Sequence, residues 1–146
     1  MNFPRIALAA VAAWIVSLTV GYFINDFVLA DLMAANQPAM RSEAELASRL
    51  PVGFVFLLLG FFAFAYAFAK GYEGTNAIAE GVRFGVLTGL VVLGFANVWQ
   101  WVMYPVTDGV LFASIVSSIV QMALYGAIVG AIYRPDNRLA GNLPAL

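Results

Sequence analysis

The chain has 146 residues, of which 63% are hydrophobic and 10% are charged, and its formal net charge is -1. A soluble domain carries about 25% charged residues, so this composition indicates an integral membrane protein and gives no basis for nucleic-acid binding. The sequence contains no cysteine and no histidine, which excludes disulfides, thiol chemistry and iron–sulfur clusters and removes the commonest ligand of haem, zinc and copper.

The first predicted span covers residues 6–29 and begins after Pro4, whose missing amide suits the start of a helix. A secretory signal is the rival interpretation of this segment, but the apolar run is too long for one, and we expect a retained helix. Small residues recur at every fourth position and predict a packing face that ends in the amide of Asn25. These residues are Ala9, Ala13, Ser17 and Gly21.

A polar stretch over residues 31–50 separates the first span from the second. Within it, Ser42 and Glu45 have the spacing of a capping box, which predicts a short helix over about residues 43–49. The leucines of this helix lie on one side and its charges on the other, so we expect it to lie along the outer membrane surface.

The second predicted span covers residues 52–69 and begins after Pro51. Phenylalanine occurs at six positions around this span, and aromatic bulk on all sides favours contact with lipid. These positions are Phe54, Phe56, Phe61, Phe62, Phe64 and Phe68. A glycine-rich turn over residues 70–74 then leads toward the third span.

The third predicted span covers residues 82–104, and glycine recurs at every fourth position where it begins. Such a row predicts a face on which another helix docks closely. The row consists of Gly81, Gly85 and Gly89. Because the first span carries a similar row and runs in the same direction, we expect the two rows to face each other. Glu80 and Arg83 predict an ion pair at the interface, with a lipid headgroup or a cytoplasmic partner as the alternative contact.

The fourth predicted span covers residues 110–133 and follows a tight reversal at Asp108-Gly109. Its first half carries serines and Gln121, and its second half carries Gly126 and Gly130, which are spaced for close helix packing. The remaining residues, 135–146, show no periodicity, and we expect a flexible tail.

The positive-inside rule predicts the orientation of the spans, because five of the seven basic residues fall on one side. These five are Arg5, Lys70, Arg83, Arg134 and Arg138, whereas Arg41 and Arg49 fall on the other side. Both termini are therefore expected in the cytoplasm. The aromatic residues agree, since Trp99, Trp101 and Tyr104 fall near the predicted outer interface and Tyr72 and Tyr133 near the inner one.

Polar side chains in the outer half of the spans predict a pocket between the first, third and fourth spans. A rise of about 1.5 Å per residue brings these side chains to similar depth. The predicted pocket contains Asn25, Asp26, Asn97, Gln100 and Gln121. Two interpretations remain open: the amides hydrogen-bond one helix to another, or they bind a ligand or ion.

The sequence resembles small bacterial membrane proteins with four predicted spans, over almost the whole chain. The resemblance rests on residues 70–74, on residues 79–85 at the start of the third span, on the aromatic residues 99–105, and on residues 126–133. It implies an inner-membrane four-helix bundle of unassigned activity. No catalytic or binding residue is carried over from it.

We therefore expect an all-α fold, a four-helix transmembrane bundle that forms one domain over residues 1–134. No catalytic residue, cofactor or metal is expected, because the polar side chains offer no nucleophile with an activating base. The expected function is a structural or accessory subunit in the lipid bilayer, packed against further copies of itself or within a larger membrane complex. The alternatives are a small transporter or ligand-binding protein with its site in the polar pocket and, more remotely, a pigment or quinone carrier.

Overall fold

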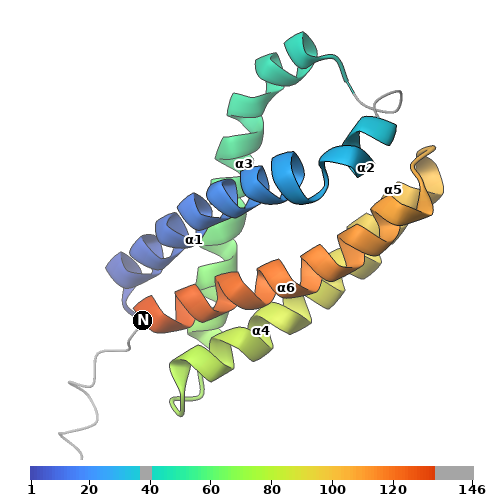
Figure 1. Ribbon diagram of the computed structural model, residues 1–146. Coiled ribbons are helices and arrows are strands. Elements are labelled where there is room, and N and C mark those ends of the chain that lie inside the picture. Colours follow the sequence, from blue (N-terminus) through green and yellow to red (C-terminus); the bar gives the residue numbers. More distant parts are fainter. Residues whose placement is uncertain (37–40, 134–146) are drawn as a thin grey trace, which may run out of the picture.

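The computed structural model describes residues 1–36 and 41–133, and the regular elements in these two ranges are all helical (Figure 1). Two of them are π-helical turns that continue the helix before them. In chain order the elements are α1 (Phe3–Phe23), η1 (Ile24–Val28), α2 (Ala30–Ala35), α3 (Glu43–Gly71), α4 (Ala77–Val92), η3 (Leu93–Asn97), α5 (Val98–Met103) and α6 (Asp108–Ile132). The predicted tail, residues 135–146, lies outside the described residues.

Within residues 1–36 and 41–133, four helical stretches are long and apolar enough to cross a membrane, as the sequence predicts. Two of them join helices through a π turn, so that α1 continues through η1 and α4 continues through η3 into α5. The four stretches are Phe3–Val28, Glu43–Gly71, Ala77–Met103 and Asp108–Ile132.

The predicted short helix over residues 43–49 is not a separate element, because α3 runs without a break through Pro51. Ser42 caps α3 with the predicted capping box, in which its hydroxyl accepts from the amide of Glu45 and the Glu45 carboxylate accepts from the amide of Ser42. Pro51 stands in the third turn of α3, where its ring removes one amide donor without ending the helix.

Glycines bring the backbones of α4 and α6 into direct contact. A Cβ atom added to Gly81 would overlap the carbonyl oxygen of Gly126, and one added to Gly89 would lie 2.6 Å from that of Ser118. A Cβ atom at Gly130 would in turn overlap the carbonyl oxygen of Ala77. The expectation that this glycine row faces the first span is therefore wrong, because α6 fills it.

The connection between the two helices explains this pairing. Only residues 104–107 separate α5 from α6, and short connections make neighbouring helices antiparallel. Gly81 lies as many residues before this connection as Gly130 lies after it, and the same holds for Gly85 and Gly126. The glycines therefore meet at matching levels when the chain folds back.

A second packed region joins α1, α3 and α6 at the end of the bundle where Tyr72 and Tyr133 lie, which we call the aromatic end. Here the small residues of α1 are buried against the rings of α3, with Ala9 and Ala13 fully covered. The expectation that the phenylalanines of the second span contact lipid on all sides is wrong for Phe61, Phe64 and Phe68, which are core residues.

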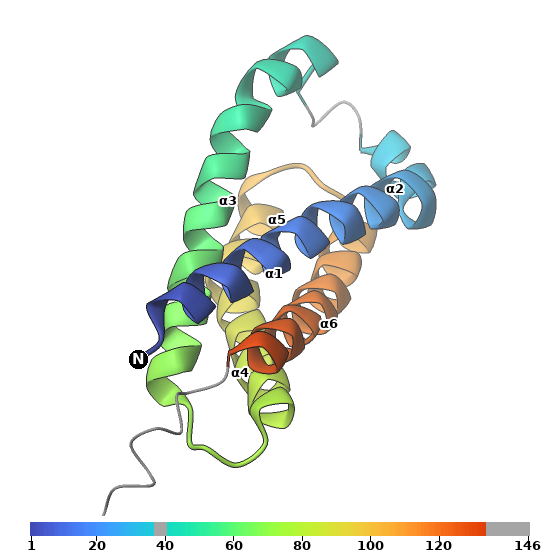
Figure 2. The same cartoon turned by 90° about the vertical axis from the view of Figure 1, so that its left-hand side faces the viewer.

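The opposite end of the bundle, which contains α2 and α5, is less closely packed, and we call it the open end. Both ribbon views show the first turns of α3 lying apart from the other helices (Figures 1 and 2), and residues 43–57 are exposed along their whole length. Asn36 connects the segment after α2 to the connection before α6. Asn36 is buried, and its side chain accepts from the amide of Thr107 at 3.0 Å and donates to its hydroxyl at 3.2 Å.

Candidate functional site

Polar side chains of α6 form a continuous stripe in the half of this helix that faces the open end. We call this stripe the α6 polar seam, and it consists of Ser114, Ser117, Ser118 and Gln121. Two grooves run along it. One lies between the seam and α4–η3 and has a volume of about 210 Å³; the other lies between the seam and α1–η1 and has a volume of about 190 Å³.

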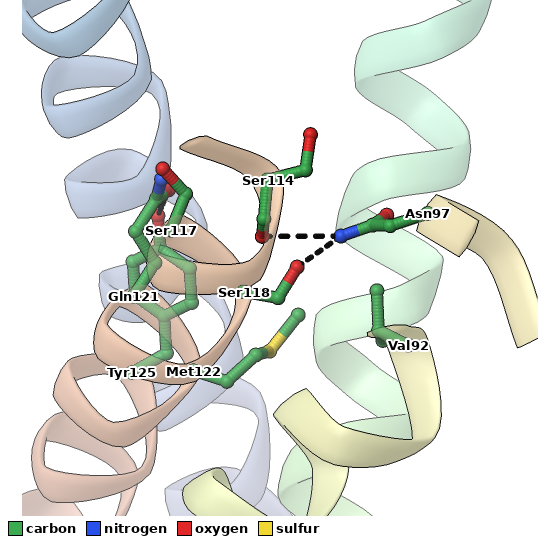
Figure 3. Close-up of a pocket in the computed structure, with 8 residues that line it drawn as sticks. All are labelled: Val92, Asn97, Ser114, Ser117, Ser118, Gln121, Met122 and Tyr125. Carbon is green, nitrogen blue, oxygen red and sulfur yellow. Dashed lines mark hydrogen bonds between the residues drawn. The ribbon is translucent and has the colours of Figure 1, made fainter. Parts of the chain in front are cut away.

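Asn97 binds the seam directly from the π turn η3. Its side-chain nitrogen donates to the carbonyl oxygen of Ser114 at 3.3 Å and to the hydroxyl of Ser118 (Figure 3). Asn97 is the last residue of η3, and a π turn inserts one residue into the helix, which rotates the residues that follow it. This contact therefore joins two helices, as the first of the two sequence interpretations predicts for an amide.

Asn25 behaves differently, although it also lies in a π turn. Its side-chain nitrogen donates to the carbonyl oxygen of Gly21 in its own helix at 2.8 Å, and the side chain is exposed. Asn25 lines the second groove, whereas Asn97 lines the first. The structure thus places the two amides in separate grooves, which share Ser114, Ser117 and Gln121.

Gln121 lines both grooves, and the oxygen of its side-chain amide accepts a hydrogen bond from within α6. Its Oε1 accepts from the hydroxyl of Tyr125 at 2.7 Å. The Gln121 amide nitrogen and the hydroxyls of Ser114 and Ser117 have no hydrogen-bond partner among the described residues, and none of these atoms is fully buried. They are therefore available to whatever fills the grooves.

The remaining members of the predicted pocket are not brought into it. Asp26 and Gln100 are exposed, and neither lines the two grooves. Asp108, which was not among the predicted pocket residues, accepts from the indole of Trp101 at 3.1 Å and also lines neither groove. Without these carboxylates the grooves have no negative charge, and no cluster of metal-binding side chains exists in the described part of the chain.

Residue spacing predicts neither the two π turns nor the contacts of Tyr125. Tyr125 closes the first groove from the aromatic end, with its ring 5.2 Å from that of Phe61 and its hydroxyl on Gln121. A pairing argument would have found the Asn97 contact, since Asn97 and Ser114 lie at equal distances from the connection 104–107. No residue pattern marks the π turns.

Chemically, the two grooves offer serine hydroxyls and the side-chain amides of Asn25, Asn97 and Gln121, next to apolar side chains. They can bind an uncharged polar group or a polar side chain of another helix, but they hold no pair of groups suited to proton transfer or nucleophilic attack. Comparisons of the chain with protein-family models, with curated proteins and with solved structures found no match.

The different partners of the two asparagines lead to a prediction for their replacement by leucine. We expect Asn97→Leu to lower the free energy of unfolding by about 1 kcal/mol, the usual contribution of an amide that bonds two helices in a membrane. Asn25→Leu is the matched control and should change it by less than about 0.5 kcal/mol, since its amide bonds its own helix. Unfolding in mixed micelles with increasing dodecyl sulfate, followed by tryptophan fluorescence, measures both values. Equal losses in the two variants would contradict the assignment of Asn97 as an interhelical contact.

Proposed function

We propose that this chain is a non-catalytic structural or accessory subunit of a membrane assembly, which it joins through its open end. The supporting observation is the uneven packing of its helices. The aromatic end holds nearly all of the core, whereas residues 43–57 of α3 have no buried side chain. Within an apolar 18-residue window of each span, the share of the window that is buried inside the protein ranges from 17% for α3 to 28% for the first span.

The polar seam favours a protein partner over lipid at the open end. Lipid chains cannot satisfy the hydroxyls of Ser114 and Ser117 or the amide nitrogen of Gln121, which lie in open grooves. A helix from another copy or another protein, carrying a polar side chain of its own, would supply the missing hydrogen bonds. The apolar residues of α3 would then cover part of the same partner.

The proposal includes an orientation and a location. Both termini lie in the cytoplasm, by the distribution of basic residues, and the bacterial inner membrane is the membrane that the sequence resemblance implies. The first turns of α3, with the charges of Glu43, Glu45 and Arg49, lie at the outer interface, where the Arg41–Glu45 ion pair of 3.8 Å faces water.

Photo-crosslinking in native membranes tests this proposal. A photoreactive phenylalanine analogue is placed at Phe56, which is 69% exposed on α3 near the open end, or at Phe112 on α6. The matched control places it at Ile78, which is also exposed, at 52%, but lies at the aromatic end. We expect protein adducts from Phe56 and Phe112 and lipid adducts from Ile78. Lipid adducts at all three positions would overturn the proposal.

A small binding protein or transporter for an uncharged polar molecule is the second candidate, and the shared polar wall of the two grooves favours it. Here the ligand, and not a helix, would bond Ser117 and Gln121. Purified chain in liposomes provides the test, with glycerol and urea as probes of flux. A transporter predicts that Ser117→Ala lowers flux while unfolding is unchanged, since this hydroxyl has no partner among the described residues. The subunit proposal predicts no flux in the unsubstituted chain.

A further inference from the structure

A third groove lies at the aromatic end, where α3 ends and α4 begins. It has a volume of about 240 Å³ and combines charged side chains at its rim with apolar ones deeper in the membrane-spanning part of the helices. The residues that line it are Phe68, Gly71, Glu73, Glu80, Arg83, Phe84 and Leu87. It is separate from the polar seam, with which it shares no lining residue.

The carboxylate of Glu80 is committed to the turn between the two helices. Its Oε2 accepts from the amide of Glu73 at 2.8 Å, and its Oε1 accepts from the amide of Thr75 at 2.8 Å and from the Thr75 hydroxyl at 2.6 Å. Glu80 is also 8% exposed. These three bonds fix the turn over residues 72–76 against α4.

Arg83 is consequently left without the partner that the sequence predicted for it. No ion pair joins it to Glu80 or to Glu73, and no hydrogen bond joins its guanidinium to any other described residue. The carboxylate of Glu73 is likewise unpaired within the described part of the chain, since only the backbone amide of Glu73 is used. Among the described residues that line it, the groove therefore presents one unpaired cation, Arg83, and one unpaired anion, Glu73.

We propose that this groove binds an aminophospholipid, with the lipid phosphate on Arg83 and its primary ammonium on Glu73. A guanidinium suits a phosphate because its planar donors match two phosphate oxygens. A carboxylate suits a primary ammonium because the ammonium donates hydrogen bonds, which a quaternary ammonium cannot do. Phe84 and Leu87, the latter 63% exposed, face the first part of an acyl chain.

The charges of the groove select this headgroup over the common alternatives. An anionic headgroup without an amine would leave Glu73 unpaired next to its phosphate, which costs free energy through repulsion. A soluble phosphate ester would gain nothing from the apolar residues that continue the groove along α4. The depth of the groove in the membrane also fits a lipid headgroup. The helices α3 and α4 belong to membrane-spanning stretches, and the groove lies where α3 ends and α4 begins, beside Tyr72.

Native mass spectrometry of the full chain, titrated with lipids of identical acyl chains, tests the proposal. We expect phosphatidylethanolamine to bind about tenfold more tightly than phosphatidylcholine or phosphatidylglycerol, as one additional charge-assisted hydrogen bond predicts. Arg83→Gln should weaken binding of phosphatidylethanolamine and phosphatidylcholine about tenfold, and Arg83→Lys should restore part of the loss. Glu73→Gln should remove the preference between these two lipids and leave phosphatidylcholine binding unchanged.

The matched control is Arg49→Gln, an exposed cation near the opposite end of the bundle, which should alter none of these affinities. Equal effects of Arg83→Gln and Arg49→Gln would overturn the proposal, as would tightest binding of phosphatidylglycerol. Competition by glycerophosphoethanolamine, the headgroup without its chains, at the same concentrations as the lipid would also overturn it, since the groove would then bind a soluble phosphate ester. Failure of the photo-crosslinking test leaves these outcomes unaffected.

Discussion

Replacing Gly85 with leucine is expected to separate α4 from α6 and to give the largest loss of stability of any single substitution considered. A Cβ atom at Gly85 would overlap the carbonyl oxygen of Met122 and lie 2.9 Å from the Cα atom of Ala123. Both obstacles are backbone atoms, which no side-chain rotation can move. The helices must shift apart, and overpacking of this kind costs about 3 kcal/mol.

The measurement is the free energy of unfolding in mixed micelles, with Gly60→Leu as the matched control. Gly60 is also a helical glycine in a membrane-spanning stretch, but a Cβ atom there would meet nothing within 4 Å. We expect the control to change the unfolding free energy by less than about 0.5 kcal/mol. Equal effects of the two variants would mean that the α4–α6 contact contributes little to the fold.

Replacing Phe68 with alanine is expected to have the second largest effect, because this ring connects three parts of the aromatic end. It lies 5.8 Å from the ring of Phe84, 5.8 Å from that of Tyr72 and 6.1 Å from that of Tyr133, and it is 2% exposed. A water-soluble core would lose about 3–5 kcal/mol. In lipid the transfer term is small, so we expect the lost packing to cost about 2 kcal/mol.

Phe56→Ala is the control for this substitution, since Phe56 lies on the same helix and is 69% exposed. Its loss should change the unfolding free energy by less than about 0.5 kcal/mol. The same unfolding experiment, with tryptophan fluorescence as the readout, compares the two variants. A similar loss of unfolding free energy in both variants would mean that packing at the aromatic end contributes little to the stability of the bundle.

The polar pocket shows which side-chain positions residue spacing can predict and which it cannot. Spacing predicted Asn25, Asn97 and Gln121 in one pocket, since helical period and depth follow from the sequence, and the structure places them along two grooves that share Gln121. Spacing also predicted Asp26 and Gln100 beside them, and these lie outside the grooves. Asp26 lies within the π turn η1, and Gln100 follows the π turn η3 in α5, so the direction of both side chains departs from the period that the prediction assumed.

Glu80 shows a second limit of the same kind. Two opposite charges three residues apart on a helix predict an ion pair, but the turn over residues 72–76 offers three donors to the carboxylate and withdraws it from Arg83. The conformation of that turn depends on how α3 and α4 are placed, which local spacing does not encode. The sequence therefore does not reveal that Arg83 is unpaired, which is the observation on which the lipid proposal rests.

The sequence by itself determined the four membrane-spanning helices and the positions of their small and polar residues, because span length and helical period are local properties of the chain. Only the tertiary structure decided which rows meet. Four-residue glycine or alanine rows occur on the first, third and fourth spans, and each row can accept any helix of suitable shape. The short connection 104–107 brings α6, and not α1, onto Gly81 and Gly85. The small-residue rows alone would allow either contact, and the connection between the helices determines which one forms.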